Sequence, residues 1–326
     1  MSSNKLRPMG PVEWALLIAL SALFGSAFFF TKVALAELKP FTVVLGRVLI
    51  AAIVLNLVVV ASGHRMSSYS RLWGAFLIMG AMNNLIPYSL IFWGQTQIAS
   101  SLASMLNATV PLFTVVLAHF LTRDERITVR RLTGVLIGIF GVAVMLGPEL
   151  LSGGFQVAGQ VACLLAAVAY AFAGIFGRRF AGIPPVVTAA GQLTATSLMM
   201  TPIALVADRP WTLPVPTLQT WGAIAGLALI STAAAYVIYF HILAVSGATN
   251  IQLVALLMPA TALVLGTVVL GEQLELYNFV GMFLIAAGLA IIDGRLIHGR
   301  FRANSSPTYA RTIASSGTPD IGHRLR

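Results

Sequence analysis

The sequence predicts an all-α integral membrane protein whose ten transmembrane helices form two inverted repeats of five helices each. Three observations predict this fold class: the composition, a series of ten apolar segments, and an internal repeat. Of the 326 residues, 58% are hydrophobic and only 9% are charged, whereas a soluble domain carries about 25% charged residues. With a mean hydropathy of +0.90, the chain belongs in a lipid bilayer.

Ten segments are apolar enough to span the bilayer, which takes about 20 residues of α-helix. Short connections with turn residues such as Pro and Gly separate them. The predicted spans are 12–35, 40–61, 72–94, 97–120, 130–147, 157–177, 185–207, 218–242, 248–270 and 277–297. The first follows Lys5 and Arg7, as in a signal peptide, but it is too long and lacks a clear cleavage site, so we interpret it as a span.

The basic residues lie mostly in every second loop, which predicts the orientation of the chain. With the N-terminus inside, the inner loops and the inner C-terminus contain Arg65, Arg71, Arg123, Arg126, Arg130, Arg131, Arg178, Arg179, Arg295, Arg300 and Arg302. Lys39 and Arg209 are the outward exceptions. We therefore expect both termini in the cytoplasm, and the polar, basic residues 299–326 as a disordered tail. This topology accounts for the net charge of +10, and no nucleic-acid partner is expected.

The sequence contains an internal repeat, which a shift of 148 residues reveals. The shift aligns Tyr88 with Tyr236, Phe92 with Phe240 and Pro111 with Pro259. It predicts two domains, residues 12–147 and 157–297. Because each domain has five helices, the second must enter the membrane from the opposite face. Inverted repeats of this kind are a transporter architecture, with the substrate site near the midplane where the repeats meet.

Two sets of motifs carry a family resemblance. The first repeat contains LFGSAFFFTKVAL, LGR, PLFTVVLAHFLTRDERIT and GVLIGIFGVAVML, and the second contains MPATALVLGTVVLGEQLEL and GMFLIAAGLAI. These motifs resemble the EamA domains of the drug/metabolite transporter (DMT) superfamily, over residues 12 to 297. The resemblance implies a ten-helix carrier in a bacterial inner (plasma) membrane. Many members of the family export amino acids and related metabolites, but the motifs do not specify the substrate.

Polar residues at the predicted midplane are the first candidates for a binding site. Asn83 and Asn84 lie halfway along the third span, and their repeat counterparts in the eighth span are Ser231 and Thr232. Tyr88 follows Asn84 by four residues, and Tyr236 follows Thr232 by four, so each pair shares a helix face. We expect these faces to bind a polar or amino-acid-like substrate. Alternatively, the amides only hold helices together through hydrogen bonds.

The fourth and ninth spans carry a further polar stripe. Ser100, Ser104, Asn107 and Pro111 follow helical spacing along one face, and the counterpart of Ser104 is Gln252. The small residues are as consistent with close helix packing as with a water-filled path. Because buried amides need hydrogen-bonding partners, Asn107 and Gln252 favour a role in lining the path.

Three ionisable residues in the predicted spans are candidates for a functional role. Lys32 and Arg47 lie toward the outer ends of spans one and two, where they would either attract a substrate carboxylate or extend to the membrane interface. His241, near the inner end of span eight, would titrate near neutral pH and is a candidate for proton coupling. The alternative is a hydrogen-bonded or interfacial histidine without that role.

Several absences narrow the function. No acidic residue lies at the midplane, which disfavours an antiporter that exchanges protons for cationic drugs. The sequence has no metal-ligand spacing, nucleophile elbow or phosphate-binding loop, so we expect no enzyme, catalytic residue, cofactor or metal. Gly134, Gly138, Gly281 and Gly288 predict close helix contacts. These contacts would join either the two halves or two protomers of a homodimer.

The sequence thus predicts a secondary transporter that exports amino acids or related zwitterions by alternating access. The alternative is a multidrug or sugar-type permease of the same fold. The predicted partners are a small-molecule substrate and the lipid bilayer. The predicted binding residues are Asn83, Asn84, Tyr88, Asn107, Ser231, Thr232, Tyr236, Gln252, Lys32 and Arg47.

Overall fold

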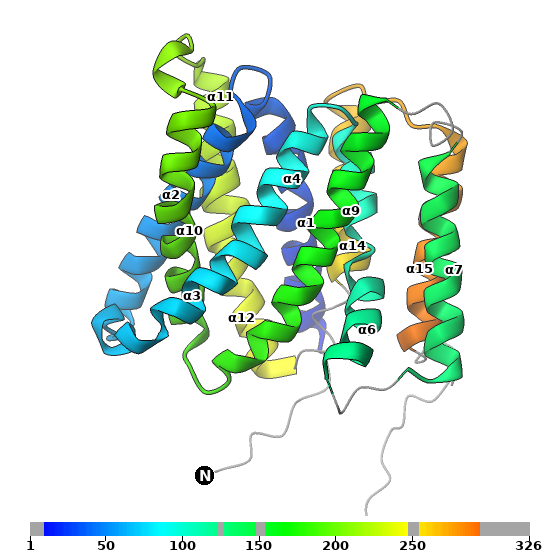
Figure 1. Cartoon of the computed structure of the whole chain (residues 1–326), viewed down its shortest axis with the longest axis horizontal. Helices are drawn as coiled ribbons and strands as arrows, with labels where there is room; N and C mark the ends of the chain where they lie inside the picture. Colours follow the sequence, from blue (N-terminus) through cyan, green and yellow to red (C-terminus); the bar gives the residue numbers. More distant parts are fainter. Residues whose placement is uncertain (1–9, 123–126, 148–153, 247–253, 294–326) are drawn as a thin grey trace, which may run out of the picture.

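The computed structural model describes residues 10–122, 127–147, 154–246 and 254–293, and in this part of the chain the regular secondary structure is helical (Figure 1). The predicted tail and Gln252 lie outside the described residues. The α-helices are α1 (Pro11–Ala34), α2 (Pro40–Ala61), α3 (Trp73–Gly80), α4 (Ile86–Gln95), α5 (Ser100–Asn107), α6 (Val110–Leu121), α7 (Val129–Leu146), α9 (Phe155–Phe176), α10 (Pro185–Ala207), α11 (Leu218–Ala225), α12 (Ala235–Ser246), α14 (Val254–Val268) and α15 (Leu276–Asp293).

The described residues include nine helical runs that are long and apolar enough to cross a membrane. A tenth apolar helix, α14, is shorter within the described residues, since it begins next to the segment 247–253. The predicted fold class is therefore confirmed. The spans run alternately between two ends of the bundle (Figure 1). We call the end where α1 begins the near end, and the end with residues 35–39, 96–99, 208–217 and 269–275 the far end.

The third and eighth spans each change helix type partway. A π-helical turn, η2 (Ala81–Leu85), separates α3 from α4, and a longer one, η5 (Gly226–Ala234), separates α11 from α12. The shift of 148 residues places η2 inside η5, so the two irregularities occupy equivalent positions in the two halves. Each π turn rotates the side chains that follow it relative to a continuous α-helix. Such turns are frequent at functional sites.

The fourth predicted span, 97–120, is broken rather than continuous. It consists of α5 and α6, with Pro111 in the first turn of α6. Proline lacks the N–H that would continue the hydrogen-bond ladder of the preceding helix. The equivalent Pro259 lies inside α14, which continues through it. The equivalent prolines thus coincide with a break between two helices in the first half and with a continuous helix in the second.

Helices α7 and α15 pack against each other at one edge of the molecule (Figure 1). Their glycines face one another: a Cβ at Gly288 would lie 2.5 Å from the carbonyl oxygen of Gly134, and one at Gly141 would lie 2.9 Å from that of Gly281. The predicted close contact therefore joins the two halves of one chain. A homodimer stays a prediction, and because these glycine faces are occupied within the chain, it would need another surface.

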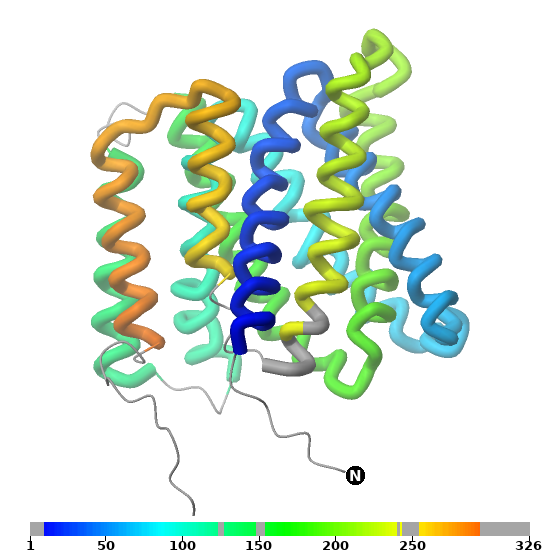
Figure 2. Tube along the Cα trace, turned by 180° about the vertical axis from the view of Figure 1, so that it is seen from behind, coloured from blue at the N-terminus to red at the C-terminus, as the bar shows by residue number. Residues whose placement is uncertain are grey.

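The centre of the bundle is formed by helices of both halves. Helix α1 runs between α14 on one side and α11, η5 and α12 on the other (Figure 2). Helix α2 packs against α10, η5 and α4, and α10 also contacts η2. The two π turns therefore lie in the middle of the molecule, with η5 next to α2 and η2 next to α10.

Candidate functional site

Arg47 of α2 is the buried cation at the centre of the molecule. It lies seven residues into the helix, about 10 Å from its far end along the axis, and its side chain is only 6% exposed. Its Nε donates a hydrogen bond of 3.0 Å to Thr232 Oγ1 of η5. Its guanidinium carbon lies 3.9 Å from the centroid of the Tyr88 ring and 5.9 Å from that of Phe92. Arg47 therefore joins the two halves.

The π turn of η5 prepares Thr232 to accept this bond. The Thr232 hydroxyl donates to the carbonyl oxygen of Leu227, five residues earlier, at 2.8 Å. A hydroxyl has one donor and two acceptor lone pairs. Because its proton points to Leu227, Thr232 offers lone pairs to Arg47. The local backbone thus determines how the arginine is held.

A second group of polar side chains also crosses between the halves. Asn83 of η2 donates from Nδ2 to Gln192 Oε1 at 3.1 Å and, more weakly, to the Tyr236 hydroxyl at 3.4 Å. Gln192 of α10 in turn donates to the same hydroxyl at 3.5 Å. Tyr236 also lies close enough to hydrogen-bond Tyr88. We call Arg47, Tyr88, Thr232, Asn83, Gln192 and Tyr236 the central cluster.

The sequence pattern did not point to Gln192, a member of this cluster, or to Tyr170, which lies beside it. Gln192 is an amide within its span, so the reasoning applied to Asn83 would have found it. Tyr170 of α9 lies close enough to interact electrostatically with Arg47, Tyr88 and Tyr236. It has no tyrosine counterpart under the repeat shift, since residue 22 is alanine. Only the packing of α9 brings Tyr170 to the cluster.

The other predicted midplane residues have different surroundings. The Ser231 hydroxyl lies 2.9 Å from that of Ser26 in α1, so Ser231 links helices. Asn84 is 0% exposed, and neither its Nδ2 nor its Oδ1 has a hydrogen-bonding partner among the described residues. Asn107, at the end of α5, has an unpartnered Oδ1 in the same part of the chain. The structure therefore brings Asn83 and Thr232 into the cluster and leaves Asn84 beside it, unpaired.

Lys32 lies outside the central cluster. Its Nζ donates to the carbonyl oxygens of Gln95 and Ile98, at 2.7 and 2.9 Å. Gln95 is the last residue of α4 and Ile98 lies just after it, at a helix C-terminus where a positive charge is favoured by the helix dipole. Of the two predicted cations, Arg47 alone reaches the cluster. His241 lies in α12, but its side chain and Gln252 are outside the described part of the structure.

Three carboxylates tie the halves together at the far end. Glu272 accepts hydrogen bonds from Ser100 N at 2.6 Å, Ser101 N at 3.0 Å and Ser101 Oγ at 2.6 Å. Asp208 accepts from the backbone and hydroxyl of Thr42, at 2.7 and 3.0 Å. Glu37 accepts hydrogen bonds from the backbone N–H and the hydroxyl of Thr217, each at 2.8 Å. Each carboxylate lies at the N-terminus of a helix in the opposite half, where negative charge is stabilised.

These contacts lower the pKa of two of the carboxyl groups. Burial raises the pKa of Glu272, but the hydrogen bonds from Ser101 and Ser100 lower it more, so its pKa is below the ordinary value. The backbone N–H of Thr217, with the hydroxyls of Thr220 and Thr217, lowers the pKa of Glu37. Both groups are therefore ionised at neutral pH, and their contacts with the opposite half are intact there.

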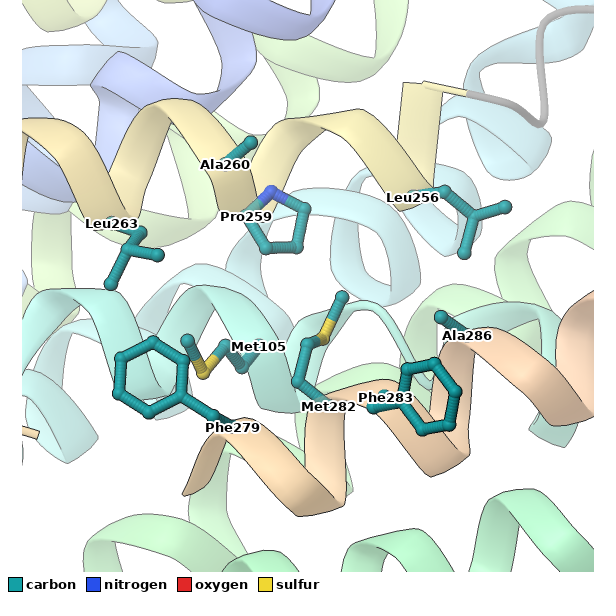
Figure 3. A pocket seen from close by; sticks show the side chains of 9 residues that line it. All are labelled: Met105, Leu256, Pro259, Ala260, Leu263, Phe279, Met282, Phe283 and Ala286. Atoms are coloured by element: carbon teal, nitrogen blue, oxygen red, sulfur yellow. The ribbon is translucent and has the colours of Figure 1, made fainter. Parts of the chain in front are cut away.

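A cavity of about 300 Å³ lies away from the central cluster, between α5, α14 and α15 (Figure 3). Its lining is entirely apolar: Met105, Leu256, Pro259, Ala260, Leu263, Phe279, Met282, Phe283 and Ala286. Phe283 is 72% exposed, so the cavity opens on the surface of the bundle. Because a binding site for a polar solute needs a few placed polar groups, this cavity is unsuited to one.

The sequence model of the EamA-like transporter family matches residues 12–147 and again residues 157–293. The chain belongs to the EamA-like transporter family. Among curated proteins it is similar to the uncharacterized transporter YoaV of Bacillus subtilis (24% identity, 84% of this chain and 94% of the relative). It is also similar to protein PecM of Dickeya dadantii (25% identity, 83% and 89%). A third relative is the uncharacterized inner membrane transporter YedA of Escherichia coli K12 (24% identity, 93% and 96%).

A solved crystal structure of a protein supports the same fold. It aligns with a TM-score of 0.65 and 21% identity, over 89% of this chain and 99% of that one. The match to the family model confirms the predicted resemblance, and the protein is a multi-pass membrane protein of a transporter family. In this EamA-like transporter, Arg47 and Asn83 of the first half hydrogen-bond Thr232 and Gln192 of the second.

Proposed function

We propose that the protein is a secondary transporter that exports a small metabolite, an amino acid or a related zwitterion, by alternating access. The observation that carries this proposal is the bond between Arg47 and Thr232. It places a buried charge of one half against a hydroxyl of the other, inside a cluster to which both halves contribute. A substrate bound there contacts both halves, so its binding responds to their relative movement.

The far-end carboxylates support a mechanism in which one end of the site is closed. Glu272, Asp208 and Glu37 each join one half to a helix N-terminus of the other. Opening the far end requires these bonds to break, whereas a substrate entering from the near end leaves them intact. With the predicted orientation, the near end faces the cytoplasm, which is the direction from which an exporter loads.

The chemistry of the central cluster agrees with an amino acid or related zwitterion. Arg47 supplies a positive charge for a carboxylate, and the rings of Tyr88 and Phe92 contact the apolar part of a solute. A cation binds poorly next to an unpaired arginine, so the cluster disfavours cationic drugs. The amides of Asn83 and Gln192 also suit sugar hydroxyls, which keeps a sugar-type permease as the second candidate.

Transport by the purified protein in liposomes tests the proposal. Uptake and efflux of amino acids, sugars and cationic dyes are compared with and without a pH gradient. We expect amino acids to move and dyes not to move. Movement of dyes without any amino acid would overturn the proposed substrate, and movement of sugars alone would favour the second candidate. Empty liposomes provide the control for leakage.

A further inference from the structure

We infer that a carboxylate is the required recognition element of the substrate, that Arg47 binds it, and that an ammonium group is not required. The ligand class is therefore small monocarboxylates with an apolar body, with or without an amino group. This inference rests on the proposed function only in taking the central cluster as the binding site.

The guanidinium of Arg47 is fixed on one edge and one face. Its Nε is bonded to Thr232, and its guanidinium carbon lies over the Tyr88 ring, 3.9 Å from the ring centroid. Stacking on an aromatic ring and a directed hydrogen bond orient the planar group without neutralising it. An arginine that only supported packing would have its remaining N–H groups bonded as well.

The other edge of the guanidinium is free. Within the described residues, Nη1 and Nη2 of Arg47 make no hydrogen bond. The fully buried polar atoms without a hydrogen-bonding partner include Nδ2 and Oδ1 of Asn84. They do not include Nη1 or Nη2 of Arg47. Two adjacent Nη groups match the two oxygens of a carboxylate, which arginine binds in a bidentate manner. The free edge is thus shaped for a carboxylate.

No protein carboxylate neutralises this charge in the described structure. The described acidic residues are Glu13, Glu37, Asp208, Glu272, Glu275 and Asp293, and all of them lie at helix ends or in loops. A buried, unpaired arginine is unfavourable in a membrane. An anionic ligand relieves this penalty, which makes the charge itself a determinant of affinity.

An ammonium group has no comparable partner in the central cluster. The neighbouring side chains, from Asn83, Gln192, Tyr88, Tyr236 and Thr232, are all neutral. Their oxygens and rings accept hydrogen bonds or a cation–π contact, but they add no opposite charge. An amine would also be repelled by Arg47. The carboxylate therefore dominates recognition.

Binding to the purified protein tests this inference without relying on transport. Thermal stabilisation is measured with four probes that share the same isobutyl group: leucine, 4-methylpentanoate, leucinamide and 3-methylbutylamine. A ligand of the folded state raises the unfolding temperature according to its affinity. We expect leucine and 4-methylpentanoate to bind within a few-fold of each other. We expect leucinamide and the amine to bind at least tenfold more weakly, since a charge-assisted pair with arginine is lost.

Variants assign the effect to Arg47. Arg47→Met should abolish the preference for acids, and Arg47→Lys, which keeps the charge, should retain the preference with weaker binding. Lys32→Met is the matched control: it removes a membrane cation that bonds only Gln95 and Ile98, and the acid preference should persist. Equal binding of acids and amides by the unmodified protein, or binding of leucine but not 4-methylpentanoate, would overturn the inference. Binding without transport in liposomes would instead refute the proposed function alone.

Discussion

Two adjacent asparagines provide a matched test of the central cluster. Asn83 and Asn84 lie in the same π turn and have the same side chain. Asn83 hydrogen-bonds Gln192 at 3.1 Å and Tyr236 at 3.4 Å, whereas both polar atoms of the fully buried Asn84 are unpartnered among the described residues. Substituting each with alanine therefore removes the same atoms from opposite hydrogen-bonding environments.

The expected effects have opposite signs. A buried, unsatisfied polar group costs about 1–3 kcal/mol, and the cavity left by an amide, about 30 Å³, costs about 0.7 kcal/mol. Asn84→Ala should therefore stabilise this conformation by about 0–2 kcal/mol. Asn83→Ala leaves Gln192 Oε1 without its donor and adds a similar cavity, so it should destabilise by about 1–3 kcal/mol. The two variants should differ by at least about 1–2 kcal/mol.

The assay is thermal unfolding of the two purified variants in the same detergent, followed by transport in liposomes. We expect Asn84→Ala to melt above the unmodified protein and Asn83→Ala to melt below it. Transport should fall in Asn84→Ala despite its stability, because its amide has no partner in this conformation and is free to bind in another. Equal melting of the two variants would refute the hydrogen-bond reasoning. Unchanged transport kinetics would remove Asn84 from the site.

Two further predictions concern the contacts between halves. Gly288→Ala places a Cβ 2.5 Å from the Gly134 carbonyl oxygen and should lower stability by about 1–3 kcal/mol. Gly222→Ala, where a Cβ would meet open space, should be neutral or raise stability by up to about 1 kcal/mol. Melting curves of the two variants test this difference, and an equal loss of stability would refute the contact. Because the pKa of Glu272 is lowered in the folded state, its contribution is present above the ordinary carboxyl pKa and is lost as pH falls through the lowered one. Glu272→Gln should therefore melt below the unmodified protein at neutral pH, and the two should converge on acidification. A difference independent of pH, or one shared by the exposed Glu275→Gln, would contradict this account.

The sequence by itself determined the helical spans and the presence of two repeats. In a bilayer, backbone groups must hydrogen-bond within each span, so a long apolar segment specifies a helix. The glycines of α7 and α15 could also be identified from the sequence. Glycines that recur on one face of a helix allow a second helix to approach closely, because their side chain is a single hydrogen atom.

Only the tertiary structure decided which polar residues act together. Helical spacing gives the face on which Asn83, Asn84 or Arg47 lies, but not the rotation of that face toward a neighbouring helix. The π turns η2 and η5 change this rotation and are not visible in the apolar pattern. As a result Asn83 reaches Gln192 while Asn84 does not, and Arg47 enters the central cluster while Lys32 binds the end of α4. The packing between helices, which differs on the scale of single ångströms, therefore decides which polar side chains come into contact.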